Sequence, residues 1–369
     1  MEAVLTVPGG QQQRVDCEWL VGADGAHSTV RHQLGMGFDG EQYAGIRTPM
    51  MDVPLHGFTL SDDAVHWLIS PQSMLVVVKL PGAHHRLILS ELDDRPPRPV
   101  VREDFQAVFD EHFAGAVTVG EPAWSSVFRI SHRMVDTYRH GQVFVAGDAA
   151  HIHSPAGGQG MNACIQDVFN LGWKLAAVVA AGAPVALLET YETERRPIAA
   201  QVLAGAHALT GIIMGHRTPL AERLAIARQP EFSRTTVEKV SGLAYSYRGH
   251  LDVPPLADPL DGLSAGDRAP DIALEAGRQL HHLLRHPHHT LLYIPGAASQ
   301  PATELSRQLI AHHPGRLQAH QIDGQEAARI YGTPGRDVFC LVRPDGYLAL
   351  RCSTRDRAAL ETVCDQTVA

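Results

Sequence analysis

An aspartate and three glycines stand close together near the middle of the chain, and their spacing suits the binding of a large polar ligand. Gly147-Asp148 ends a short apolar run, and Gly157, Gly158 and Gly160 follow soon afterwards. A carboxylate at the end of a buried strand can accept hydrogen bonds from ligand hydroxyls, because open α/β sheets bind ligands beyond the carboxyl ends of their strands. Glycines lack a Cβ, so the backbone can approach a ligand closely. The structural alternative is that Asp148 caps a neighbouring turn.

The residues that follow these glycines predict the start of a long helix. Apolar residues recur between positions 161 and 179 at helical spacing. The N–H groups of Met161 and Asn162 have no partner within such a helix, and a helix N-terminus carries partial positive charge. This end suits an anion, or the edge of a flavin ring that gains negative charge on reduction. Residues 158–163 match G-x-G-x-x-A, but no strand directly precedes them, so we reject a dinucleotide-binding loop.

A second aspartate occupies a similar position near the N-terminus. Asp24 follows an expected strand at 15–22, which pairs with a strand at 3–7. Gly25 leaves room for a close backbone approach, and Arg31 lies on the short helix that follows. The alternative interpretation is a strand–turn–helix corner without a ligand.

Together these two segments resemble the motifs of the aromatic hydroxylases with the para-hydroxybenzoate hydroxylase fold, a family of FAD-dependent monooxygenases. The stretch GADGAHSTVR (22–31) resembles the family's DG motif. The stretch GDAAHIHSPAGGQGMNACIQDVFNLGWKLA (147–176) resembles its second FAD motif, and YETERRPIA (191–199) continues the match. The β-α-β-α-β-β-α order expected near the C-terminus is similar to the thioredoxin-like domain of the branch that hydroxylates phenols and polyketides.

The resemblance implies FAD as cofactor and gives roles to the residues of both motifs. Asp148 would bind the ribityl chain, and Asp24 would lie near the pyrophosphate, where it would help NADPH or NADH to engage. The other implied cofactor contacts are Gly25, Gly147, Pro155, Gly157, Gly160, Met161 and Asn162. The implied reaction is hydroxylation of a phenolic or polycyclic, polyketide-type aromatic through a flavin C4a-hydroperoxide.

Candidate substrate contacts lie in the β-rich middle of the chain. Arg129 stands where a last strand would face a pocket, with a salt bridge as the alternative, and Trp67 lines either a pocket or the core. His151 and His153, beside the flavin motif, are interpreted as making local hydrogen bonds rather than as catalytic groups. The histidine-rich stretch 281–289 matches no standard ligand pattern, so we predict a solvated polar surface and no metal site. No catalytic base is identified.

The chain departs from the resembled family at its N-terminus. Members begin with a strand, a GxGxxG loop and a helix, whereas this sequence begins partway through that domain. We therefore expect an N-terminally truncated flavin hydroxylase with impaired activity. The alternatives are a non-catalytic remnant that binds an aromatic ligand or a partner, and half of a split flavoprotein whose second chain supplies the missing FAD lobe. A homodimer is a further expectation.

The expected fold class is α/β with mixed α+β character. A partial FAD-binding, Rossmann-like domain lacking its first βαβ unit comprises residues 1–45 and returns at 131–250, on either side of a β-rich substrate domain at 46–130. A linker at 251–269 leads to a thioredoxin-like domain at 270–369. This last domain lacks a CxxC pair, so we expect it to be structural or to form an interface.

Composition excludes several classes of protein. The 369 residues carry a net charge of −9 without a basic stripe, which argues against a nucleic-acid partner. Five dispersed cysteines favour a reducing compartment, and the first residues lack the pattern of a signal peptide. The most apolar window, 175–188, is shorter than the roughly 20 residues of a membrane span. We expect a cytoplasmic protein with a small aromatic substrate and no membrane partner.

Overall fold

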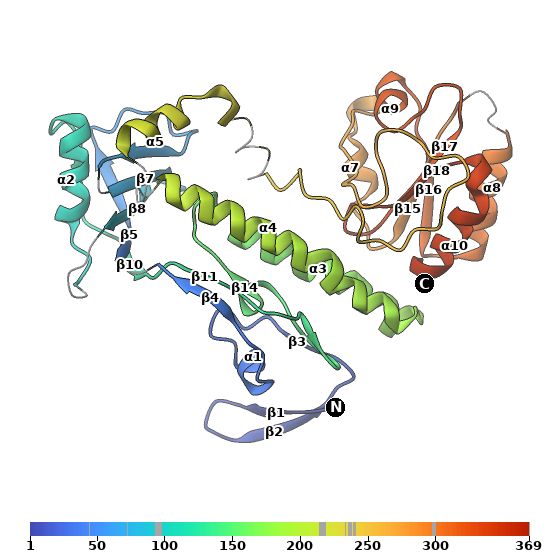
Figure 1. Ribbon diagram of the computed structural model, residues 1–369, viewed down its shortest axis with the longest axis horizontal. Coiled ribbons are helices and arrows are strands. Elements are labelled where there is room, and N and C mark those ends of the chain that lie inside the picture. The colour runs from blue at the N-terminus through green and yellow to red at the C-terminus, as the bar shows by residue number, and fades with distance from the viewer. Residues whose placement is uncertain are drawn as a thin grey trace.

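Two long helices run side by side through the middle of the molecule in this computed structural model (Figure 1). α3 (Gly160–Ala181) ends at Gly182, whose φ of 78° is the left-handed conformation that glycine favours at helix ends. After Pro184, the 3-10 turn η2 (Val185–Glu189) leads back into α4 (Thr190–Ile213). Among the described residues, no helix combines the length and the apolarity that crossing a bilayer requires.

The structure describes residues 1–369 except 44, 72, 93–97, 214–218, 233, 235–237, 239, 240, 297–299 and 369. Part of the FAD-binding region expected at 131–250 therefore lies outside the described residues, whereas α5 (Leu220–Ala227) lies within them.

The strands that carry the two aspartate motifs lie in a small sheet with the order β12-β13-β3. β3 (Leu20–Gly22) pairs in parallel with β13 (Val143–Val145), so that Gly22 stands opposite Val145. β12 (Arg139–His140) adds to β13 in the antiparallel sense, and α1 (Thr29–Gln33) follows β3. Parallel strands have their carboxyl ends at the same edge of a sheet, so this register brings the turns after β3 and β13 together.

The strand expected at 15–22 is wrong in its extent, because the structure divides it between two sheets. β1 (Glu2–Thr6) and β2 (Gln12–Asp16) form an antiparallel hairpin of their own, while β3 pairs with β13. The strand breaks where the chain changes partner, and Trp19 in the break packs against Phe144 of β13 with ring centroids 5.8 Å apart.

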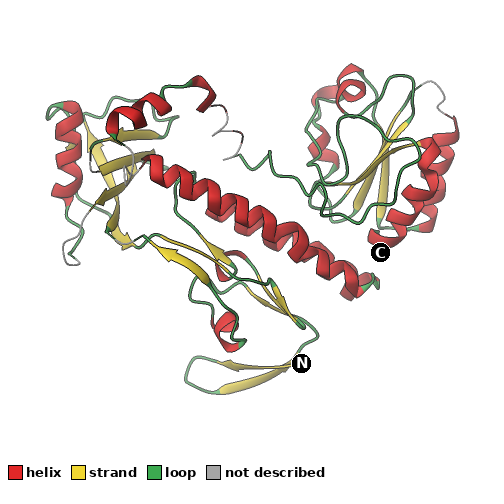
Figure 2. Cartoon of the chain, viewed as in Figure 1, coloured by secondary structure: helices red, strands yellow, loops and turns green. Residues whose placement is uncertain are grey.

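The part of the chain that lies between the two motifs in sequence folds into a larger antiparallel sheet, which Figure 2 shows at one end of the long helices. Its order is β10-β5-β8-β7-β6, with β9 paired to the end of β5. Phe105 and Phe109 of α2 (Arg102–Phe113) pack on its buried side chains, among them Val53 and Leu87. The strands are β5 (Ile46–His56), β6 (His66–Ile69), β7 (Ser73–Lys79), β8 (His84–Leu92), β9 (Thr118–Val119) and β10 (Trp124–Phe128).

The last strand of this region, β10, ends at Phe128, one residue before Arg129, which we expected on it. After β10 the chain enters β11 (Ser131–Met134), which pairs with β4 (Asp39–Gln42) on one side and β14 (His151–Ile152) on the other. This three-stranded sheet connects the large sheet to the glycine loop, because β14 directly precedes that loop.

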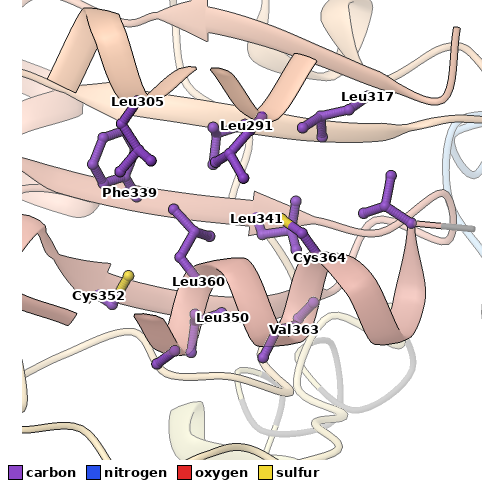
Figure 3. Close-up of a cluster of buried hydrophobic side chains, with 14 of the residues drawn as sticks. Leu291, Leu305, Leu317, Phe339, Leu341, Leu350, Cys352, Leu360, Val363 and Cys364 are labelled. Carbon is purple, nitrogen blue, oxygen red and sulfur yellow. The ribbon is translucent and has the colours of Figure 1, made fainter. Parts of the chain in front are cut away.

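The C-terminal module is a four-stranded sheet with helices on both faces, in the order β16-β15-β17-β18. β15 (His289–Ile294) pairs in parallel with β16 (Leu317–Gln321), while β17 (Val338–Val342) and β18 (Leu348–Ser353) form the predicted hairpin. α8 (Gln300–His312) and α10 (Arg357–Thr367) share one apolar core, in which Leu305, Leu360 and Cys364 meet the sheet (Figure 3). α7 (Leu280–Leu283) and α9 (Gln325–Ile330) pack on the other core. The predicted α/β fold class is confirmed.

One turn of this module reaches the helix pair through buried charges. Arg343, at the end of β17, donates to both carboxylate oxygens of Glu194 at 2.8 Å, and Lys174 lies 2.8 Å from the same carboxylate. Asp345 in the hairpin turn accepts a hydrogen bond from Nε1 of Trp173 at 3.2 Å. The module is therefore joined to α3 and α4 by an ion cluster that water does not reach.

Candidate functional site

A cavity of about 740 Å³ brings the two motifs together, and we call it the site cavity. Its volume lies within the range of small-molecule and cofactor pockets, which is about 300–1,000 Å³. The end of β13, the glycine loop and the start of α3 all contribute to its walls. The predicted cofactor contacts that line it are Gly25, Gly147, Asp148, Pro155, Gly160 and Met161.

Three predicted cofactor contacts do not line the site cavity. Asn162 faces a separate cavity of about 360 Å³, because one residue of helix turns the side chain away from the face that Met161 presents. Gly157 lines a third cavity, of about 620 Å³, on the other side of the loop. Asp24 turns back to α1, where its Oδ2 accepts a hydrogen bond from the N–H of Val30 at 3.1 Å. The strand–turn–helix alternative therefore describes the Asp24 side chain.

The electrostatics of Asp24 agree with this capping role. Burial alone would raise the pKa of Asp24, but hydrogen bonds from Ser28 and from the Val30 backbone hold it below its ordinary value. The carboxylate thus stays ionised at the positive end of a short helix, where negative charge is favourable.

Arg31 ties the first motif to the second. Its buried guanidinium donates to the carbonyl of Ala26 at 2.8 Å and to the carbonyl of Ala149 at 2.9 Å. It also lies 3.8 Å above the ring of Phe38. Because both carbonyls belong to the turns at the sheet edge, Arg31 fixes the distance between the two turns that face the cavity.

A fully buried carboxylate binds the backbone of the turn that begins at Gly147, in the second motif. Asp167 of α3 accepts hydrogen bonds from the Gly147 N–H at 3.2 Å and from Arg195 at 2.8 Å, and its Oδ2 lies 2.7 Å from Nε2 of His151. Burial would raise the pKa of Asp167, but Arg195 and His151 keep it below the ordinary value. His151 therefore serves this network, in line with the interpretation that it makes hydrogen bonds rather than reacts.

Sequence reasoning missed the network around Asp167. The available signal was an ionisable residue within the apolar run of a long helix, at a position where α3 faces α4. Such a group requires a partner of opposite charge. Arg195, in the stretch that continues the family resemblance, is that partner.

Asp148 itself lines the cavity, and the described residues give its carboxylate one side-chain hydrogen bond. Cys164 Sγ donates to its Oδ1 at 3.3 Å, and burial together with the Asp148 charge raises the pKa of the Cys164 thiol to about 12. The thiol therefore stays protonated and remains a donor. The exposed Asp148 carboxylate keeps capacity to accept hydrogen bonds from ligand hydroxyls.

His153 lines the site cavity with an unused nitrogen. Its Nδ1 contacts the Ser154 carbonyl at 2.7 Å, while its buried Nε2 has no hydrogen-bond partner among the described residues. Burial lowers the pKa of His153, so the ring is neutral near pH 7. A buried nitrogen without a partner is costly, which fits a ligand that supplies one.

The glycines of the wall leave space that fits a flat ligand. A Cβ built on Gly25 or on Gly158 would meet no protein atom within 4 Å, although both residues line the cavity. Side chains there would project into open space. With the helix start, the Asp148 carboxylate and the unpaired His153 nitrogen, this wall suits a ring with an electron-rich edge and a hydroxylated tail, as in FAD.

The two predicted substrate residues have different positions. Arg129 lines the site cavity, next to Phe128 and Ile130. Trp67 lies on β6, opposite Val76 of β7, and lines none of the cavities described above. The structure therefore brings Arg129, and not Trp67, to the site.

The histidine-rich stretch is only partly the solvated surface that we predicted. His289 is buried at the start of β15, where its ring meets Trp173 of α3 at 5.4 Å, and burial with the nearby Arg343 lowers its pKa to about 3. The prediction was wrong for His289 because it belongs to a central strand. His281 and His282 remain outside the buried core.

The shared cavity, the β-rich middle region and the thioredoxin-like C-terminal module are together those of a flavin-binding protein. Residues 1–206 match the family model described as FAD binding domain, and residues 263–368 match the model described as aromatic-ring hydroxylase, C-terminal. The chain belongs to the FAD-dependent aromatic-ring hydroxylases, as its resemblance implied.

Two curated relatives illustrate the match. The chain is 38% identical over 373 residues to pentachlorophenol 4-monooxygenase of Sphingobium chlorophenolicum, covering 95% of this chain and 68% of that protein. It is 33% identical to 6-methylpretetramide 4-monooxygenase of Streptomyces rimosus, covering 93% of this chain and 65% of that protein. The chain thus spans about two thirds of the length of these relatives.

Solved structures agree with the fold over almost the whole chain. The anhydrotetracycline hydroxylase OxyS from Streptomyces rimosus superposes with a TM-score of 0.76 and 30% identity, covering 99% of this chain and 72% of that one. Aklavinone-11 hydroxylase, solved as a ternary complex with FAD and aklavinone, superposes with a TM-score of 0.73 and 25% identity, covering 100% and 70%.

Proposed function

We propose that this chain binds FAD in the site cavity and takes part in the hydroxylation of a phenolic or polycyclic aromatic substrate, with NADPH or NADH as reductant. The observation that carries the proposal is the common cavity of Asp148, the glycine loop and the start of α3. Bound FAD would supply the redox chemistry, by taking a hydride from the nicotinamide and activating O2 so that one oxygen atom reaches the aromatic ring.

The chain's own residues would hold and orient the cofactor. Asp148 would accept hydrogen bonds from the ribityl hydroxyls, since the protein supplies it with one donor, Cys164. The N–H groups of Gly160 and Met161 would face the electron-rich edge of the ring. Asp24 would act indirectly, by capping α1 beside Gly25.

We assign the aromatic substrate to the cavity of about 620 Å³ on the other side of the glycine loop. Phe232 and Tyr245 contribute aromatic walls, and small residues of α4 leave room beside them. Neighbouring residues of one loop line the two cavities, with Gly158 on the site cavity and Gly157 on this one. A substrate here would lie beside the cofactor, and Arg129 remains a candidate contact from the cofactor side.

The names of the relatives support a ring-shaped, hydroxylated substrate. They refer to pentachlorophenol, to 6-methylpretetramide and to anhydrotetracycline. Apolar walls with few polar groups suit such molecules, because apolar area supplies most of the affinity and the polar groups fix the orientation.

The test is to titrate the purified chain with FAD while recording visible absorption and flavin fluorescence. We expect saturable binding that weakens by about tenfold or more in Asp148→Ala, because each hydrogen bond to a charged group contributes about 1.5–3 kcal/mol. Asp136→Ala is the matched control, since Asp136 is exposed and lies outside the site cavity. The loaded protein should then oxidise NADPH or NADH faster when a polyphenol is added, and 18O from 18O2 should enter the product.

Two results would contradict the proposal. One is that the chain fails to bind FAD at all. The other is that Asp148→Ala and Asp136→Ala bind it equally well, which would mean that the cofactor lies elsewhere.

The expectations of impaired activity and of a non-catalytic remnant find no support among the described residues. Pairing with a second copy, or with a second chain that supplies further FAD contacts, stays a prediction. Size-exclusion chromatography with light scattering, with and without FAD, tests it.

A further inference from the structure

Three potential metal ligands converge at the edge of the C-terminal module, outside the flavin site. His312 is the last residue of α8, His313 follows it, and Asp365 lies on α10. Nε2 of His312 lies 3.6 Å from Oδ1 of Asp365, and Nε2 of His313 lies 3.4 Å from the same oxygen. We propose that these three side chains bind a divalent transition-metal ion of the Zn²⁺ type.

The distances fit a tetrahedral ion. Zn²⁺ lies about 2.0–2.2 Å from imidazole nitrogens and carboxylate oxygens, so two ligands of a tetrahedral ion stand about 3.4 Å apart. The separations of 3.4 and 3.6 Å match this edge, and all three ligand atoms lie within 4.8 Å of one another. A set of two imidazoles and one carboxylate binds Zn²⁺ in preference to Mg²⁺ or Ca²⁺. It leaves the fourth position of a tetrahedral ion for water.

His313 supplies an independent observation. The residue is 8% exposed, and its Nε2 has no hydrogen-bond partner among the described residues, since the approach to Asp365 lacks hydrogen-bond geometry. The backbone of Val368 forms a hydrogen bond with the same ring. Histidines that bind metals usually donate their other ring N–H to a carbonyl or carboxylate, which orients the free nitrogen toward the ion. The buried Nε2 is therefore held in place, with its lone pair free to bind an ion.

The two helices that carry the three ligands pack on one buried core. Leu305 and Leu309 of α8 and Leu360 and Cys364 of α10 belong to one buried core, and Figure 3 shows the side chains of both helices directed toward the sheet. The ligands thus stand on two helices whose relative position the core sets. An ion would link the end of α8 to α10 without rearranging either helix.

Arg316, a basic side chain close to His313, has another partner. Arg316 donates to the carbonyl of Ala181 at the end of α3, at 3.1 Å, and does not pair with Asp365. The ion pairs that the described residues make with Asp365 are those to the two histidines. His312 and Asp365 are largely exposed, so an ion can enter from solvent while His313 anchors it from the buried side.

The test is a Zn²⁺ titration of the untagged, chelator-treated chain by calorimetry, with thermal unfolding followed in parallel. We expect one ion per chain, no comparable binding of Mg²⁺, and a rise in Tm with Zn²⁺, because an ion that binds the folded state alone stabilises it. Asp365→Asn and His313→Gln should each weaken Zn²⁺ binding by about tenfold or more. His250→Gln is the matched control, since His250 is exposed and far along the chain from the three ligands.

Because His313 is buried, His312→Gln serves as a second variant that leaves the core intact. Absence of Zn²⁺ binding to the wild-type chain, or equal affinity in the wild type and all three ligand variants, would overturn the proposal and leave an ordinary surface ion pair. FAD binding should be the same in all of these variants, so the outcome does not depend on the proposed function.

Discussion

The buried carboxylate of Asp167 accepts a hydrogen bond from the backbone N–H of Gly147 at 3.2 Å, directly beneath the turn that presents Asp148 to the site cavity. The same carboxylate is paired with Arg195 at 2.8 Å, and both side chains are completely buried. The ion pair between two helices therefore also sets the position of the turn that lines the site cavity.

This relationship predicts a combined loss of stability and FAD affinity in Asp167→Asn. The substitution leaves Arg195 buried without its counter-charge, which costs about 3–5 kcal/mol. It also loosens the Gly147 turn, so FAD should bind more weakly. Urea denaturation and FAD titration measure the two effects. The double variant with Arg195→Gln should lose less than the sum of the single losses, and strict additivity would show that the pair is not coupled.

Two glycines with the same φ allow the cost of crowding a new Cβ to be separated from the cost of a strained backbone. Gly141 and Gly147 both have a φ of 61°. Alanine at either position must adopt the left-handed conformation, at a cost of about 1–2 kcal/mol. A Cβ on Gly147 would also lie 3.1 Å from the Cβ of Cys164, whereas one on Gly141 meets nothing within 4 Å. Gly147→Ala should therefore be less stable in urea than Gly141→Ala, by about 1–3 kcal/mol. Equal stability of the two variants would mean that α3 can move away from the new Cβ at Cys164 without cost.

Alanine at Gly158 should affect FAD binding as well as stability. Its φ is 63°, and a Cβ there meets no protein atom within 4 Å, as at Gly141. Gly158→Ala should thus cost the same stability as Gly141→Ala. Because Gly158 lines the site cavity, only Gly158→Ala should weaken FAD binding, by about tenfold if the methyl group costs roughly 1.4 kcal/mol. Unchanged FAD affinity in Gly158→Ala would place the ring away from this loop.

The lowered pKa of Glu194 predicts that the folded protein loses stability in acid. Burial would raise its pKa, but Arg343 and Lys174 lower it from 4.5 to about 2. The unfolded chain therefore binds a proton in this interval that the folded chain does not. The contribution of Glu194 is fully present above about pH 4.5 and is lost as the pH falls toward 2, amounting to about 3 kcal/mol.

The measurement is the free energy of unfolding in urea across that pH interval. Glu194→Gln should lose stability at pH 7, because Arg343 and Lys174 are left buried without a counter-charge, and should show a shallower loss between pH 4.5 and 3 than the wild type. Glu361→Gln is the control, since its ion pair with Arg357 lies at the surface and contributes little. A wild-type slope in Glu194→Gln would assign the acid sensitivity to other carboxylates.

Local patterns in the sequence were sufficient to predict the elements whose ends are marked by nearby residues. The long helix spans Gly160–Ala181, in agreement with the apolar period at 161–179, and Gly182 follows its last residue. The C-terminal hairpin turns at residues 344–346, between two apolar strands. In both cases the signals are short-range, because helix caps and tight turns depend on a few consecutive residues.

The predictions that were wrong concern residues whose contacts lie far away along the chain. The stretch 15–22 looks like one strand, yet it divides because β1 and β13 compete for it. Asn162 and Gly157 stand among the predicted cofactor contacts, yet helix rotation and the path of the loop direct them to other cavities. His289 lies in a polar-looking stretch, yet it starts the central strand of a sheet.

The order of residues along the chain was enough to find the two aspartate turns, the glycine loop and the helix start, and through their resemblance the family and its cofactor. Which of those residues share a cavity, and that Asp167, Arg195 and Arg31 hold them there, emerged from the folded chain alone. This division arises because a motif is a property of neighbouring residues. The burial of a charge and the choice of its counter-charge depend on contacts between residues far apart in the chain.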